Sequence, residues 1–197
     1  MPVLLGVLWP LERINSGLLA VGRALAVLAL AVMVFLILGQ VFMRYVLNDA
    51  PNWTEEGARF GMLWLTGLMA PSAYRMGGFV SIDMLERALP RVAAALLSLL
   101  LLAISLWVLV ICWERGLNNH VNSLSGRGAS ASLRVPLDWL GGEQIKFRNS
   151  WQYLSLFVGV NLLILVNIEL ILRQIVTLMG GADRLTPIAQ PVVAGAD

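Results

Sequence analysis

Two adjacent carboxylates and an arginine stand at the start of an apolar run in "DAPNWTEEGARFGMLWL", residues 49–65. Paired carboxylates are the groups that general acid/base chemistry and proton transfer use most often after histidine. Glu55 and Arg59 are four residues apart, and Glu56 and Arg59 are three apart, so a helix places all three in one sector. The stretch therefore offers either a reactive site or an anchor for a helix end.

The depth of these charges in the apolar run separates the two roles. Arg59 lies about 9 Å along a helix from Trp53, which is within reach of a membrane interface for a long cationic side chain. Residues 60–74 contain no charged side chain. An ion or proton path needs ionisable groups near the middle of the bilayer. The shallow position of these charges therefore favours an anchor for the helix end over an ion or proton path.

Three interpretations of the stretch stay open. In the first, Asn52 and Glu55 form a capping box, which stabilises a helix by about 1 kcal/mol, and Arg59 pairs with Glu56 or with a lipid phosphate. In the second, Glu56 and Arg59 face a neighbouring membrane protein. The third is a site for a transported ion. Arg44, at the end of the preceding apolar run, is expected within reach of Glu55 or Glu56.

The composition places these residues in a membrane protein. Of the 197 residues, 58% are hydrophobic and only 13% are charged, which is far from the balance of a soluble domain. A helix needs about 20 apolar residues to cross the hydrocarbon core. Four stretches reach that length, at about residues 24–43, 53–74, 92–113 and 151–171. We expect an all-α integral membrane protein with four transmembrane helices plus short interfacial helices.

The segments between the spans complete this expectation. Residues 1–22 and the end of the 75–91 connection are predicted as short interfacial helices, and 114–150 as a long, periplasmic loop. One membrane domain covers residues 1–179, and the tail 180–197 is expected to be disordered. The positive-inside rule, weighted for residues near the helix ends, favours cytoplasmic termini. An aromatic belt is expected at the opposite face, formed by Tyr45, Trp53, Trp113, Trp151 and Tyr153.

The inventory of reactive residues argues against an enzyme. His120 is the only histidine and Cys112 the only cysteine, so a zinc site, a bis-histidine haem or a disulfide cannot be assembled. The sequence has no GxSxG, HExxH or P-loop motif. The net charge of +2 comes without a basic run, which excludes a nucleic-acid surface. We expect no catalytic residue, no metal and no cofactor.

The fourth apolar stretch carries polar side chains of its own. Asn161 and Asn167 are predicted to support helix packing. Glu169 and Arg173 have the i, i+4 spacing of an ion pair, which we place at the inner membrane interface.

Two segments together resemble a known family. "FMRYVLNDAPNWTEEGARFGMLWL" followed by "YRMGGFVSIDML" is similar to the small membrane subunit, the DctQ-like small permease, of tripartite ATP-independent periplasmic (TRAP) transporters. The resemblance covers residues 20–175. Positions that match the family pattern are Arg44, Tyr45, Trp53, Glu55, Glu56, Trp64, Arg75, Gly77 and Asp83, with Arg59 a looser match. The chain departs from the pattern at Phe79, where histidine is usual, at Phe157, where proline is frequent, and in its long third connection.

The resemblance implies a role in transport at the bacterial inner membrane. It implies a small scaffold subunit of a sodium-coupled, binding-protein-dependent secondary transporter for an organic acid or related solute. Its partners would be the large TRAP membrane subunit, a transiently bound periplasmic substrate-binding protein and membrane lipid.

The same resemblance assigns roles to the matching residues. Those at the expected periplasmic helix ends would form a helix-end anchor or large-subunit interface: Arg44, Tyr45, Trp53, Glu55, Glu56, Arg59 and Trp64. Arg75, Gly77 and Asp83 would form a cytoplasmic loop motif. A separate hypothesis is that the 114–150 loop helps to dock the binding protein. The alternative is a stand-alone four-helix exporter, which needs a carboxylate deep in a helix. Residues 24–39 contain none.

Overall fold

The computed structural model describes residues 2–48, 52–77, 90–116, 128–135, 145–181 and 185–188. Four long helices make up most of this part of the chain, and two short strands complete it. The helices are α1 (Pro2–Tyr45), α2 (Asn52–Arg75), α4 (Arg91–Arg115) and α5 (Ser150–Leu178), and the strands are β1 (Ala129–Val135) and β2 (Ile145–Arg148). The predominantly helical class is therefore confirmed.

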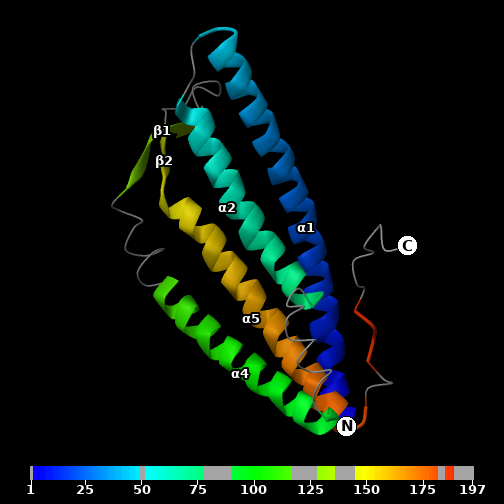
Figure 1. Cartoon of the computed structure of the whole chain (residues 1–197). Coiled ribbons are helices and arrows are strands. Elements are labelled where there is room, and N and C mark those ends of the chain that lie inside the picture. Colours follow the sequence, from blue (N-terminus) through cyan, green and yellow to red (C-terminus); the bar gives the residue numbers. More distant parts are fainter. Residues whose placement is uncertain are drawn as a thin grey trace, which may run out of the picture.

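The helices lie side by side in the order α1, α2, α5, α4, with the inner pair α2 and α5 parallel to each other and antiparallel to the outer pair α1 and α4 (Figure 1). The N-terminal end of α1, the C-terminal ends of α2 and α5 and the start of α4 lie toward the same end of the molecule. The C-terminal end of α1, the start of α2 and the two strands lie toward the other end. Because α2 packs against both α1 and α5, it is an inner helix of the arrangement.

The first helix is longer than predicted. Residues 1–22 were expected to form a separate interfacial helix, but α1 is one continuous helix of 44 residues, about 66 Å long. That expectation is wrong, and Glu12, one of the residues that suggested an interfacial helix, binds Arg173 of α5 instead, as described below. Pro10 lies inside α1 and does not end it. The predicted interfacial helix before residue 91 lies outside the described residues.

The long third connection contains a β-hairpin that the sequence analysis did not predict. Strands β1 and β2 pair antiparallel, with Val135 opposite Ile145 and Ala129 opposite Arg148. The ring of Phe147 on β2 makes edge-to-face contacts with Phe60 of α2 and with Trp151 of α5, each with centroids 4.8 Å apart. The hairpin is thereby packed against the ends of two helices.

Among the described helices, three are long and apolar enough to cross a membrane: α1, α4 and α5. The helix α2 does not reach this level of hydropathy, because charged, small and polar residues interrupt its apolar run. All four helices nevertheless share one spacing. An arginine and an aromatic residue are separated by 22 positions in each (23 and 45, 53 and 75, 91 and 113, 151 and 173), which corresponds to about 33 Å of helix. This length is close to the hydrocarbon thickness of about 30 Å.

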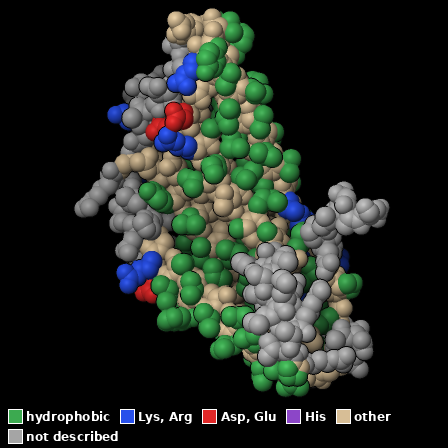
Figure 2. Space-filling view, viewed as in Figure 1, with side chains coloured by type: hydrophobic (Ala, Val, Ile, Leu, Met, Phe, Trp, Pro, Cys, Tyr) green, Lys and Arg blue, Asp and Glu red, His purple; other side chains and the backbone are tan. Residues whose placement is uncertain are grey.

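Apolar side chains face outward over much of the molecule (Figure 2). On α1, Phe35 is 77% exposed and Leu38 63%, and on α4, Trp107 is 67% exposed. Buried side chains include Leu19, Leu68, Val166 and Val176. An apolar surface of this extent is characteristic of a lipid or protein contact rather than of a surface in water.

Small residues allow α2 and α5 to approach closely. A Cβ added to Gly159 would lie 2.7 Å from the carbonyl oxygen of Gly67, and one added to Gly67 would lie 2.5 Å from that of Ser155. Pro71 has no N–H to donate to the Gly67 carbonyl four residues earlier, so this oxygen is directed at α5 without its helical partner. Close contact through small residues is a common packing mode of membrane helices.

The Gly159→Ala substitution tests this contact. We expect the free energy of unfolding to fall by about 1–3 kcal/mol, because the new methyl group forces the helices apart. Gly39→Ala in α1 is the matched control, since nothing lies within 4 Å of its added Cβ. Replacing glycine by alanine raises helix propensity by about 1 kcal/mol at both positions. The difference between the unfolding free energies of the two variants therefore measures the clash alone. Denaturant unfolding of the purified protein in detergent measures both, and equal stability of the two variants would contradict the packing.

Candidate functional site

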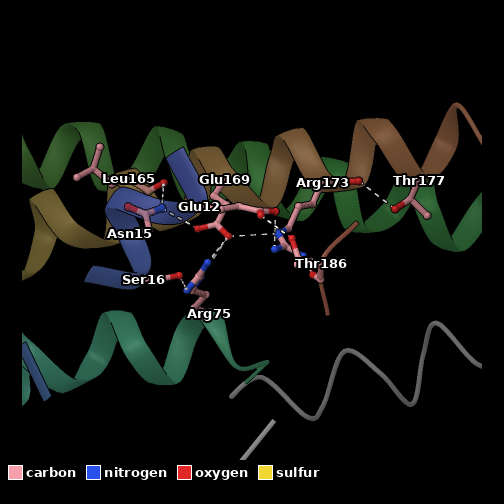
Figure 3. Close-up of polar contacts among 9 residues, drawn as sticks. All are labelled: Glu12, Asn15, Ser16, Arg75, Leu165, Glu169, Arg173, Thr177 and Thr186. Carbon is pink, nitrogen blue, oxygen red and sulfur yellow. Dashed lines mark hydrogen bonds and ion pairs between the residues drawn. The ribbon is translucent and has the colours of Figure 1, made fainter. Parts of the chain in front are cut away.

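The side chain of Glu169 on α5 is completely buried and lies at the centre of a polar network (Figure 3). Its Oε2 accepts a hydrogen bond of 2.7 Å from Nδ2 of Asn15 on α1. Its Oε1 accepts bonds from Arg75 of α2 and from Arg173 one turn along α5. One carboxylate therefore joins three helices.

Arg75 reaches this carboxylate from the last residue of α2. Its Nη2 and Nε lie 2.7 and 3.1 Å from Oε1 of Glu169. Its Nη1 donates a 2.8 Å hydrogen bond to the hydroxyl of Ser16 on α1. Arg75, which was predicted to lie in a cytoplasmic loop motif, is instead the last residue of α2, and its side chain, only 13% exposed, ties α2 to both neighbours. The side of the membrane on which it lies stays a prediction.

Arg173 extends the network toward the N-terminal part of α1. Its Nη2 lies 2.6 Å from Oε1 of Glu12, and its Nη1 donates to the backbone carbonyl of Thr186. The hydroxyl of Thr186 donates to Oε2 of Glu12 at 2.7 Å. The predicted Glu169–Arg173 pair is thus present at 3.2 Å, but it lies within the helix assembly. Thr186, in the tail expected to be disordered, is held against it.

The charges of this network balance. Two carboxylates, Glu12 and Glu169, face two guanidinium groups, Arg75 and Arg173. A buried charge is tolerated when it is paired and its remaining hydrogen-bonding capacity is used. Here both oxygens of Glu169 are occupied by donors. The arrangement is suited to holding helices in place.

A second polar contact ties α5 to α2 and α4. Nδ2 of the fully buried Asn167 donates a 2.7 Å hydrogen bond to the hydroxyl of Tyr74, which also bonds to Ser105 of α4. The predicted packing role therefore fits Asn167. Asn161 instead donates to the carbonyl of Phe157 in its own helix.

The charged residues at the start of α2 face outward. Nη2 of Arg59 lies 2.5 Å from Oε1 of Glu55, with the two side chains 71% and 59% exposed. We expected Arg59 to pair with Glu56 or with a lipid phosphate, and Glu55 to cap the start of the helix. Glu55 does lie in the first turn, where the helix dipole favours an acid, but its carboxylate binds Arg59. The side chain of Asn52, the other half of the predicted capping box, lies outside what the structure describes.

A shallow recess of about 390 Å³ lies beside this pair. It is lined by Glu56, Arg59, Met62 and Leu63 from α2 and by Asn149 and Gln152 near the start of α5. Met62 is 61% exposed and Leu63 45%. Charge and apolar surface therefore occur together on one outward face, and charged side chains stand out over the upper end of α2 in Figure 2.

The remaining predicted residues at this end are spread over the helix ends. Tyr45 and Trp53 are exposed, as membrane-interface anchors are. Trp64 is half-buried beside Phe60, and its indole N–H has no acceptor among the described residues. Arg59, and not Arg44, is the cation that binds Glu55.

At the other end, sequence reasoning missed most of the network. Gly77 ends the α2 region with a φ of +80°, which suits glycine, and Asp83 lies outside the described residues.

Four residues of the network were not predicted as site residues: Glu12, Asn15, Ser16 and Thr186. The signal was present in the i, i+3 spacing of Glu12 and Asn15 within an apolar helix. In the described part of the chain, no three potential metal-ligating side chains come together.

The Glu169→Gln substitution tests whether the network holds the helices. We expect the free energy of unfolding to fall by about 3–5 kcal/mol, because two buried guanidinium groups lose their shared anion. Glu55→Gln is a matched control, since it breaks another i, i+4 pair with an arginine that is exposed and contributes less than about 1 kcal/mol. Denaturant unfolding compares the two. Losses of similar size would show that the buried network is not decisive.

Comparison with known proteins assigns the chain to a family. Residues 32–177 match the model of the family described as "Tripartite ATP-independent periplasmic transporters, DctQ component". This match includes Arg75, Glu169 and Arg173, whereas Glu12, Asn15 and Ser16 precede it. Comparison with curated proteins and with solved structures gave no match. Because the matched region takes in about three quarters of the chain, from the C-terminal third of α1 almost to the end of α5, the protein belongs to the DctQ family of small TRAP transporter components.

Proposed function

We propose that the protein is the scaffold subunit of a sodium-coupled TRAP transporter for an organic acid or related solute. In this role it supports a large membrane subunit that carries the transport site, and a periplasmic binding protein delivers the solute. Family membership supports the transport role and the existence of these partners. The rest of the proposal depends on how this chain uses its polar residues.

The observation that carries the scaffold role is the buried network around Glu169. Its four charges neutralise one another and join α1, α2 and α5 at fixed distances. Moving one of these helices would expose or separate buried charges, which costs several kcal/mol. Residues 24–43, 60–74 and 92–113 contain no charged side chain that could bind an ion between the helix ends. These features support a fixed element against which a partner moves.

We also infer that α2 crosses the membrane, giving four spans with both termini in the cytoplasm. The spacing of about 33 Å between an arginine and an aromatic residue occurs in α2 as in its three neighbours. The lower hydropathy of α2 fits its inner position, where α1 and α5 cover it. Arginine-rich helix ends on one side support the cytoplasmic assignment of that side.

The outward charges at the start of α2 are the proposed contact with the large subunit. Charged side chains in a membrane helix normally face the interior of a bundle or a water-filled cavity. Arg59 instead lies on the outer face, next to the recess lined by Glu56 and Met62. A partner surface would cover both its charge and the apolar side chains around it.

Charge reversal at Glu56 tests this contact. We expect Glu56→Lys to lower co-purification of the large subunit and binding-protein-dependent uptake by about tenfold or more, because like charges across an interface cost several kcal/mol. Glu114→Lys, an exposed reversal near the end of α4, is the matched control and should leave both unchanged. Normal assembly and uptake with Glu56→Lys would refute the interface.

The β-hairpin is the proposed docking element for the binding protein. It projects from the helices at the end that the orientation above places in the periplasm. Lys146 and Arg148 on β2 are exposed there. The rings of Phe147, Phe60 and Trp151 fix the strand in position.

Reversing both hairpin charges tests the docking. With Lys146→Glu and Arg148→Glu together, we expect several-fold more binding protein to be needed for half-maximal uptake, while the large subunit still co-purifies. The conservative pair Lys146→Arg and Arg148→Lys should behave like the unmodified protein. If uptake by the reversed variant depends on binding-protein concentration as before, these charges take no part in docking.

A further inference from the structure

A recess of about 690 Å³ opens beside the buried network, at the end of the molecule where the helix termini gather. The helices α1 and α2 form two of its walls, and residues 186–188 of the tail contribute a third. Trp9, 67% exposed, is one of its lining residues, and Pro187 and Ile188 supply further apolar surface. The recess is therefore partly polar and partly apolar.

The charges that line this recess do not balance. Arg13, Arg23, Arg75 and Arg173 line it, against the single carboxylate of Glu12. The buried network accounts for two of these cations, since Arg75 binds Glu169 and Arg173 binds Glu12 and Glu169. Neither Arg13 nor Arg23 forms an ion pair with any of the described residues. Within the part of the chain that the structure describes, the recess thus has two more positive charges than its ion pairs use.

A buried hydroxyl without a partner gives an independent indication of a polar ligand. Ser72 of α2 lines the recess, is only 2% exposed, and its Oγ makes no hydrogen bond within the described part of the chain. A buried hydroxyl left unpaired costs about 1–3 kcal/mol. Arg23 is close to this position along the helices, because its neighbour Gly22 packs against the Leu68 carbonyl one turn before Ser72. A hydrogen-bond acceptor with negative charge would satisfy both groups.

The position of Arg23 along α1 identifies the level of the membrane involved. It lies 22 positions from the exposed Tyr45, or about 33 Å, which places it at the edge of the hydrocarbon core if Tyr45 marks the opposite edge. Arg75 has the same separation from Trp53. Phosphate groups of lipids occupy this level. Arg13 lies about 15 Å further out, toward the aqueous side.

We propose that this recess binds the headgroup of an anionic phospholipid. The lipid phosphate lies between Arg23 and Ser72, accepting a hydrogen bond from the Ser72 hydroxyl. The apolar side chain of Ile188 contacts the glycerol and the start of the acyl chains. Arg13 attracts the negative headgroup from the aqueous side. Basic pockets between membrane helices are known receptors for anionic headgroups.

Lipid titration of the whole chain, purified in detergent and delipidated, tests the site. Native mass spectrometry would follow the binding of phosphatidylglycerol and of zwitterionic phosphatidylethanolamine, with inorganic phosphate as a competitor. We expect phosphatidylglycerol to bind several-fold more tightly than phosphatidylethanolamine, and millimolar phosphate not to displace it. Each basic residue near an anionic surface contributes about 1 kcal/mol, so Arg13→Gln with Arg23→Gln should weaken phosphatidylglycerol binding about 30-fold.

A matched double variant controls for the loss of charge. Arg115→Gln with Arg148→Gln removes the same charge at the opposite helix ends and should leave phosphatidylglycerol binding unchanged. Ser72→Ala should weaken binding several-fold without affecting the two arginines. Unfolding midpoints without lipid check that each variant is folded.

Three results would overturn the proposal. The first is equal phosphatidylglycerol binding by the Arg13→Gln/Arg23→Gln variant and the unmodified chain. The second is that inorganic phosphate displaces bound phosphatidylglycerol as effectively as added phosphatidylglycerol does, which would identify a site for a free anion. The third is loss of large-subunit assembly in that variant with lipid binding intact, which would identify a protein contact. The proposal does not depend on the scaffold role.

Discussion

A carboxylate with no exposed surface must be surrounded by donors, and the burial of Glu169 imposes this condition on the whole molecule. The donors come from α1 through Asn15, from α2 through Arg75 and from α5 through Arg173. Each of them is bound in turn, so the position of one helix depends on the other two. Because the attraction between buried charges and the cost of their desolvation largely cancel, the network is better understood as fixing the arrangement than as adding stability.

The need to cover polar groups also explains the inner position of α2. This helix is less apolar than its neighbours and would be poorly solvated by lipid on all its faces, but α1 and α5 cover much of it. Gly67 and Gly159 bring the backbones of α2 and α5 together, and Arg75 closes the contact at one end. The charges of this helix thus divide into two groups. Arg75, directed inward, holds the helices together, and Glu55 and Arg59 pair with each other on the outer face.

Much of the fold was predictable, because membrane insertion leaves its mark on local sequence. The long apolar runs predicted the first residues of α4 and α5 to within a few positions. They could do so because a helix exposed to lipid needs an apolar side chain at almost every outward position. One expectation failed and one element went unpredicted, for the same reason. The N-terminal segment continues into α1, and the third connection forms a hairpin fixed by Phe147. Both depend on contacts with residues far away in the sequence.

The sequence by itself determined that this is a membrane protein, where its apolar helices lie and which transporter family it belongs to, because these properties depend on residue type and local spacing. It also showed the i, i+4 pairing of Glu169 with Arg173. Only the tertiary structure decided that Glu12, Asn15 and Arg75 meet at that pair and that Arg59 faces outward with Glu55. The reason is geometric: spacing along one helix defines its faces, but only packing decides which face meets another helix.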